Sequence, residues 1–189
     1  MKKALIISKT KQSTESLAQL LYSEGYEKSS LASSSATAKD FIGKEEFDLI
    51  LINIPLENET GLELAIFAAT TTQACVVTIV HEQHSADVLE ELTKYGILVI
   101  SRPINKHLFH HYLIFTDCYR NRILGVVQEN DKLKNMVEEV KLINRAKLLL
   151  MQCLTMTEKQ AHHYLEKQAM DLRISKIQIA KQVIKTYEN

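Results

Sequence analysis

Tryptophan is absent from this 189-residue chain, and proline, cysteine and glycine occur only two, three and five times. The prolines are Pro55 and Pro103, so no proline ring interrupts a helix later in the chain. The cysteines, Cys75, Cys118 and Cys153, are odd in number and form no CxxC pair. This spacing excludes a disulfide-rich secreted scaffold, and we expect buried or partly buried thiols in a reducing cytoplasm.

Catalytic and phosphate-binding motifs are also missing. The five glycines are dispersed, so the chain has neither a P-loop pattern nor GxGxxG, and GxSxG and HExxH are absent as well. The apolar run nearest the N-terminus, ALII, is too short for a signal peptide or a membrane span. We therefore expect a cytoplasmic protein that is not an enzyme, uses no cofactor or metal, and has no membrane partner.

Charge is balanced overall, with 23 basic and 23 acidic residues, but it is distributed unevenly. Residues 1–104 hold nine Lys and Arg against fourteen Asp and Glu, a net charge of −5. Residues 105–140 are neutral, and residues 141–189 hold nine against four, a net charge of +5. This asymmetry indicates that only the C-terminal segment meets a polyanion.

The first hundred residues alternate between short apolar runs and amphipathic segments. The run FDLILINI is nearly continuous in apolar residues, which is typical of a strand buried on both faces of a parallel sheet. Alternation of this kind predicts an α/β, doubly wound, flavodoxin-like fold. We interpret SSLASSS, residues 29–35, as a short polar loop between a strand and a helix. The expected strands are residues 3–8, 47–54, 74–80 and 97–101, and the expected helices are residues 13–25, 61–70 and 85–96.

A single long helix of about ten turns is predicted after Pro103. Its apolar positions recur at spacings of three and four, which is typical of a coiled-coil seam. The stripe could instead pack on the sheet of its own chain, but this explanation serves only residues 105–115. We therefore predict a homodimer through residues 116–143, and the seam residues are Tyr119, Val126, Leu133, Met136 and Val140.

Two further helices are predicted, and each begins at a capping box that can be recognised in the sequence. In TEKQ, residues 157–160, Thr157 can cap the helix while Gln160 returns a bond, and SKIQ, residues 175–178, repeats the arrangement. Apolar residues follow each box at helical spacing. Together with the end of the long helix, these segments predict a small all-α three-helix bundle.

The α/β segment, residues 3–115, resembles the receiver domain of bacterial response regulators in its order of elements, in DLILINI followed by GLEL, and in SRP at 101–103. The resemblance places Asn53 at the phosphoacceptor aspartate and Ser8 and Lys9 at the two acidic Mg²⁺ ligands. Val80 takes the place of the hydroxyl residue and Arg102 that of the lysine before a proline in a cis peptide bond.

These replacements remove the chemistry of a receiver. An acyl phosphate needs a carboxylate nucleophile, and the transfer needs Mg²⁺ on hard oxygen ligands. An amide is a poor nucleophile, and the lysine repels the metal. We therefore predict a pseudo-receiver that is not phosphorylated at Asn53, in which this residue has a structural role such as hydrogen-bonding its loop. Such a domain would be controlled instead by a regulatory protein or a ligand.

The C-terminal segment, residues 143–184, resembles the ANTAR domain, an RNA-binding three-helix module of transcription antiterminators. The positions that carry this resemblance are Arg145, Ala146, Lys147, Leu149, Met151, Glu158, Ala161, Leu165, Ala169, Met170, Ile177 and Ala180. The resemblance implies binding to a pair of stem-loops in nascent messenger RNA. A dimer suits such a target, because each copy could hold one loop.

Five residues are candidates for RNA contact: Arg145, Lys147, Tyr164, Arg173 and Lys176. The cations can neutralise phosphates, and an aromatic ring can stack on an unpaired base. Basic residues on short helices are, however, often only solvated, and the tyrosine fits a core position equally well.

The whole sequence thus predicts a pseudo-receiver at residues 1–115, a coiled-coil dimerisation helix at 116–143 and an RNA-binding domain at 144–189. The predicted function is transcription antitermination through hairpin loops in leader mRNA. The alternative is a signalling scaffold whose C-terminal segment contacts only proteins. Regulation through DNA is a weaker option, because no helix-turn-helix pattern with a separate recognition helix is present.

Overall fold

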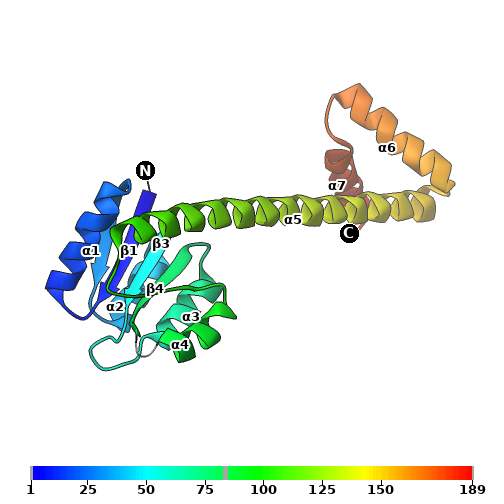
Figure 1. Ribbon diagram of the computed structural model, residues 1–189. Helices are drawn as coiled ribbons and strands as arrows, with labels where there is room; N and C mark the ends of the chain where they lie inside the picture. Colours follow the sequence, from blue (N-terminus) through cyan, green and yellow to red (C-terminus); the bar gives the residue numbers. More distant parts are fainter. Residues whose placement is uncertain (1, 83–84, 189) are drawn as a thin grey trace. The chain divides into compact units, whose positions relative to one another are not determined.

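The computed structural model describes residues 2–82 and 85–188 of the chain. The backbone divides into two compact units, residues 1–124 and 125–189 (Figure 1). The first is an α/β unit and the second is entirely helical. Helix α5, Lys106–Leu154, begins in the first unit and ends in the second.

The first unit contains a five-stranded parallel sheet in the order β2-β1-β3-β4-β5. This order and the helices between successive strands confirm the predicted doubly wound, flavodoxin-like fold. The predicted strands lie within two residues of the observed ones. The strands are β1 Lys2–Ser8, β2 Tyr26–Ala32, β3 Leu49–Asn53, β4 Cys75–His81 and β5 Leu98–Arg102.

Two apolar layers enclose this sheet because side chains alternate between its faces. One layer joins β1 and β3 residues to α1 and to the start of α5, where Phe109 and Leu113 are buried. The other joins the opposite faces of the same strands to α2, α3 and α4. Figure 1 shows helices on both sides of the strands. The helices are α1 Lys11–Ser23, α2 Ser35–Lys44, α3 Leu62–Thr71 and α4 Ser85–Thr93.

The prediction of a polar loop at residues 29–35 is wrong for most of its length. Residues 29–32 belong to β2, and Ser35 is already the first residue of α2. Because β2 is the edge strand and pairs only with β1, its outward positions can be polar or exposed, as Leu31 is. The loop is reduced to two serines, of which Ser34 caps α2 by accepting from the Thr37 amide.

The predicted long helix is confirmed, and α5 is longer than expected, with 49 residues in about fourteen turns. Its contact with the sheet also continues beyond residue 115. The Arg120 guanidinium lies 2.9 Å from the Asp48 carboxylate, and Lys2 pairs with Asp117 at 2.6 Å. Polar anchors therefore fasten α5 to the amino ends of the strands one and two turns beyond Leu113, the last apolar residue of α5 that is buried in this unit.

In the second unit, α6, Glu158–Leu172, and α7, Lys176–Tyr187, pack with the last turns of α5. Both predicted capping boxes are confirmed: Thr157 and Ser175 each accept from the third helical amide, and Gln160 and Gln178 return the bond. The core is built from small and branched residues of all three helices, namely Ala146, Leu150, Ala161, Leu165, Ala169, Ile179, Ala180 and Val183.

The prediction of buried thiols holds only in part. Cys75 is half-buried, but Cys118 and Cys153 are exposed on α5. These two lie on helix faces that contact neither the sheet nor the bundle core, so burial of a cysteine is not required there. Burial raises the pKa of the Cys75 thiol to about 11. Among the described residues, no helix combines the length and hydrophobicity that crossing a membrane requires.

Candidate nucleic-acid interface and receiver cleft

The carboxyl edge of the sheet carries the residues predicted to replace a phosphorylation site. Ser8 and Asn53 end neighbouring strands and lie opposite each other in register. The Asn53 Nδ2 atom donates a hydrogen bond to Ser8 Oγ over 2.9 Å, and both residues are buried. The amide thus ties β3 to β1 instead of presenting a carboxylate to a phosphoryl donor.

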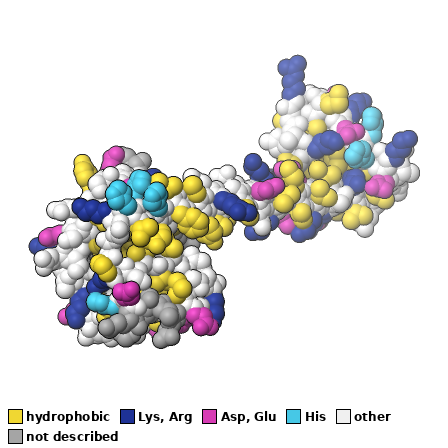
Figure 2. Space-filling view, in the orientation of Figure 1, with side chains coloured by type: hydrophobic (Ala, Val, Ile, Leu, Met, Phe, Trp, Pro, Cys, Tyr) yellow, Lys and Arg dark blue, Asp and Glu magenta, His cyan; other side chains and the backbone are white. Residues whose placement is uncertain are grey.

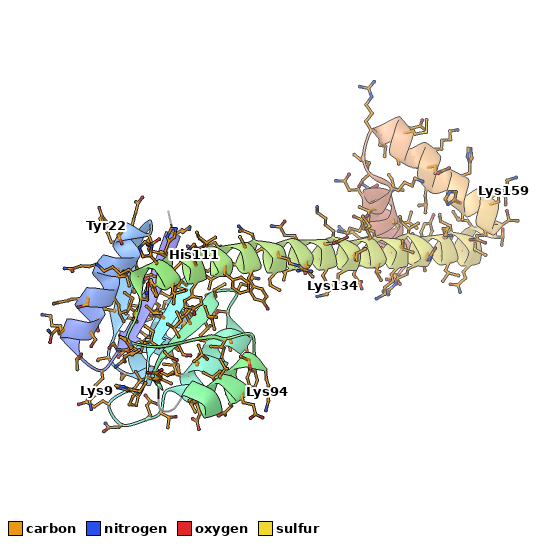
Figure 3. The ribbon with its side chains drawn as sticks, viewed as in Figure 1. Lys9, Tyr22, Lys94, His111, Lys134 and Lys159 are labelled. Carbon is orange, nitrogen blue, oxygen red and sulfur yellow. The ribbon has the colours of Figure 1, made fainter. Side chains whose placement is uncertain are left out.

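The remaining predicted cleft residues occupy different environments. Lys9 is exposed just beyond β1, as Figure 3 shows, whereas Val80 is fully buried in β4. Arg102 is half-buried, and its Nη1 atom lies 3.4 Å from Nε2 of His81, a neighbour that we did not predict from the sequence. Desolvation lowers the pKa of Arg102. The peptide bond between Arg102 and Pro103 is cis, as the resemblance implied, and so is the bond between Ile54 and Pro55.

The predicted seam residues on α5 are all exposed within the single chain. Tyr119, Val126, Leu133, Met136 and Val140 are 44% to 59% exposed, although all are large apolar or aromatic side chains. Four of them recur every seven residues, which is the coiled-coil period. Ile123 and Val137 are exposed as well and widen the stripe. An unpartnered apolar stripe of this length is unusual for a solvated helix face.

Three of the predicted RNA-contacting cations are paired with carboxylates of the same unit. Arg145 donates to Glu188, Lys147 lies 3.0 Å from Glu158, and Lys176 lies 2.6 Å from Glu166. His162 is also within 3.2 Å of Glu166. The hydrogen bond from Lys176 is the main reason why the pKa of Glu166 is lowered. Capping and apolar spacing reveal the helices, but these ion pairs between helices could not be read from the sequence.

The other two predicted contacts differ from these. Tyr164 is half-buried and packs against the core of the second unit, so only part of its ring is available. Arg173 is exposed at the left-handed C-cap of α6, with φ of 54°, and it forms no ion pair with the described residues.

Basic side chains that the sequence reasoning missed lie on α6. Lys159, His163 and Lys167 are exposed and spaced four residues apart, so they share one face of the helix. Figure 2 shows Lys, Arg and His side chains gathered over this unit, and Figure 3 labels Lys159 near the start of α6. Attention to the i, i+4 spacing of basic residues could have found this row. The described residues contain no group of three or more His, Cys, Asp and Glu arranged to hold a metal ion.

Comparison with known sequences finds a domain family and a relative. A family model of the ANTAR domain matches residues 131–184. The aliphatic amidase regulator of Pseudomonas aeruginosa is 29% identical over 122 residues, a match that covers 64% of this chain. The match spans 61% of the length of that regulator.

Comparison with solved structures concerns the first unit. A CheY-like receiver domain protein from Methanospirillum hungatei superposes with a TM-score of 0.59 and 21% identity, covering 65% of this chain and 98% of that one. The beryllofluoride-activated NtrC4 receiver domain dimer gives a TM-score of 0.57 and 20% identity, covering 64% of this chain and 99% of that one. The chain therefore joins a receiver-type fold to a segment that matches the ANTAR domain.

Proposed function

We propose that this chain, with its ANTAR domain behind a receiver-type unit, is a transcription antitermination regulator that binds stem-loops in nascent leader mRNA in the cytoplasm. The observation that carries the proposal is the ANTAR match at residues 131–184, which overlaps most of the segment 141–189 with its net charge of +5. A basic three-helix unit can neutralise phosphates while leaving unpaired loop bases to be read by side chains.

Dimerisation through α5 is part of the same proposal. The seam of Tyr119, Val126, Leu133, Met136 and Val140 is exposed in one copy, and burial against a second copy would remove it from water. Two ANTAR domains in one dimer would bind two hairpins with the advantage of a high effective concentration. We retain residues 1–115, 116–143 and 144–189 as the proposed pseudo-receiver, dimerisation and RNA-binding segments.

Control would pass through the receiver-type unit without phosphorylation. Its strand ends offer Ser8, Lys9 and Asn53 where phosphoryl transfer needs three carboxylates. A regulatory protein or a ligand that binds one conformational state of the dimer more tightly would increase the population of that state.

The test is a titration of the purified chain against a leader RNA with two hairpins, at two salt concentrations. Arg145→Ala/Lys147→Ala should weaken binding and flatten the salt dependence, by roughly 0.7–0.9 in slope for each phosphate contact removed. The matched control is Lys132→Ala/Lys134→Ala, which removes two positive charges from α5 before the bundle. Figure 3 labels Lys134 on this part of the helix.

Tight binding that depends on the loops and is lost only in the first double variant would support the proposal. Weak, equal binding of every RNA by all three proteins would contradict it. That result would favour the alternative, a scaffold whose C-terminal unit contacts only proteins. Competition by duplex DNA as strong as that by hairpin RNA would favour DNA as the target.

A further inference from the structure

A cleft of about 330 Å³ opens at the carboxyl edge of the sheet in the first unit. Its polar walls are Gln12, Ser13 and Ser16 of α1, with Asn53 from the end of β3 and Arg102 from the end of β5. In a sheet of order 2-1-3-4-5, the connections reverse direction between β1 and β3, and ligands bind in the crevice beyond that point. The volume lies at the lower end of the range for small-molecule sites.

The charge of the cleft is opposite to that of a metal-binding pocket. Among the described residues, no carboxylate lines it, and Arg102 is the only charged side chain in its walls. The described residues offer this guanidinium no ion pair, and its one hydrogen-bond partner is His81 at 3.4 Å. Since a guanidinium carries five N–H donors in a planar fork, most of its capacity to bind an oxyanion is unused.

Helix α1 adds to the positive potential. The cleft is lined from its first two turns, where partial positive charge gathers, and the first turn contains no acidic residue. Lys9 stands exposed directly before this helix. An anion in the cleft would therefore meet a guanidinium from one side and a helix amino end from the other.

The Asn53 side chain supplies a second, independent observation. It is 7% exposed and lines the cleft; its Nδ2 atom bonds to Ser8, but its Oδ1 atom is buried without a hydrogen-bond partner among the described residues. A buried acceptor without a donor is costly. A ligand that carries a hydroxyl beside its negative charge would satisfy this oxygen.

We propose that the cleft binds a small oxyanion that also carries a hydrogen-bond donor, such as a hydroxycarboxylate or a monobasic phosphate. Arg102 and the amino end of α1 hold the charge, and Asn53 Oδ1 accepts the donor. Binding is non-covalent and needs no metal. This site would be the ligand input of the receiver-type unit, and its existence does not depend on whether the ANTAR domain binds RNA.

The test uses the ¹⁵N-labelled full chain without Mg²⁺ and follows amide signals by NMR during titration with three probes. Glycolate and inorganic phosphate carry both an anion and a donor, whereas acetate lacks the donor. Glycolate or phosphate should move the Asn53 side-chain amide and the backbone amides of Ser8 and Ser13 in a saturable way. Acetate should bind about tenfold more weakly than glycolate, because the Asn53 oxygen stays unpaired.

Variants distinguish a site from general charge attraction. Arg102→Gln should weaken binding about tenfold or more, since a charge-assisted hydrogen bond is lost. Ser16→Glu places a carboxylate on the cleft wall at an exposed helix position where folding is tolerant, and it should weaken binding similarly. The control, Arg122→Gln, makes the same chemical change at an exposed position of α5 and should bind as the unmodified chain does.

Three results would overturn the proposal: no saturable shifts at these amides, shifts scattered over the surface, or equal affinity in Arg102→Gln and Arg122→Gln. Preference for phosphate over glycolate would identify the ligand as a phosphate compound, and the reverse preference would identify a hydroxycarboxylate. RNA binding is measured separately, so failure of either claim leaves the other intact.

Discussion

An amide at position 53 changes the chemistry of the sheet edge although it changes few atoms. A carboxylate there would be ionised and able to attack phosphorus, whereas the Asn53 amide donates to Ser8 and joins two strands. Ser8 is itself buried, so neither residue is positioned as a metal ligand in open solvent. We therefore predict that no phosphoryl group is transferred to this edge of the sheet.

Restoring the single carboxylate should not restore phosphorylation. In Asn53→Asp, Ser8 and Lys9 still supply no anionic ligand for Mg²⁺, and the buried Val80 supplies no hydroxyl. After incubation with acetyl phosphate and Mg²⁺, mass spectrometry should find no acyl phosphate on the unmodified chain or on this variant. A stable phosphorylated species in the unmodified chain would refute the pseudo-receiver interpretation.

Carboxylates that pair with the predicted RNA-contacting cations should compete with phosphates. Glu158→Gln releases Lys147, and we expect RNA affinity to rise about two- to fivefold, the range that a surface ion pair can supply. The Glu158 side chain is 73% exposed and that of Lys147 15%. The Thr157–Gln160 capping box is untouched, so α6 should stay folded. Filter binding against a two-hairpin RNA measures the change.

The control for this prediction is Asp171→Asn, which removes the same charge from α6 at a position without an ion pair among the described residues. It should alter affinity less than Glu158→Gln does. If both variants behave alike, only net charge matters and Lys147 has no specific role at the interface.

At the scale of whole elements, the sequence predicted helices better than the edge of the sheet. The boxes at Thr157 and Ser175 are local signals, because each capping bond joins residues three apart. Strand β2 lacks such a local signal. It is an edge strand, and its backbone hydrogen bonds are made with β1, which lies about 25 residues earlier in the chain. The α1 wall of the cleft and the ion pairs of the second unit escaped prediction for the same reason, since they join distant segments.

The apolar stripe of α5 should hold two copies together. Leu133→Glu places a carboxylate at the middle of the seam, where burial without a partner is costly, and should convert a dimer into monomers. Light scattering after gel filtration gives the mass directly. Lys134→Glu, one residue along and outside the seam, should leave the dimer intact. If the unmodified chain is a monomer, the prediction that this stripe forms a dimer interface is wrong.

The anchor between α5 and the sheet should matter for stability. The Asp48 carboxylate accepts from the Lys3 amide over 2.7 Å and pairs with Arg120, so Asp48→Ala leaves a half-buried guanidinium and an amide without partners. We expect the free energy of unfolding to fall by about 1–3 kcal/mol. Urea denaturation followed by circular dichroism measures this loss.

The comparison variant is Asp40→Ala, which breaks an exposed i, i+4 pair with Lys44 and should change stability by less than about 0.5 kcal/mol. Equal losses in the two variants would mean that the Arg120 anchor contributes no more than a surface ion pair.

At the scale of the whole molecule, the chain combines a receiver-type fold, an exposed apolar stripe on α5 and a basic segment that matches the ANTAR domain. Sequence patterns were sufficient to predict the fold class and the order of these parts along the chain. The partners of individual side chains required the structure. In the function that we propose, RNA binding is the output, and a ligand in the cleft or a bound protein is the input.

The most direct measurement is terminator read-through in transcription reactions reconstituted with purified RNA polymerase and a template that encodes the two-hairpin leader. We expect that the full chain increases read-through and that Arg145→Ala/Lys147→Ala does not, while Lys132→Ala/Lys134→Ala behaves as the unmodified chain does. Read-through that is unchanged by the full chain on a template whose RNA it binds would contradict antitermination as its function.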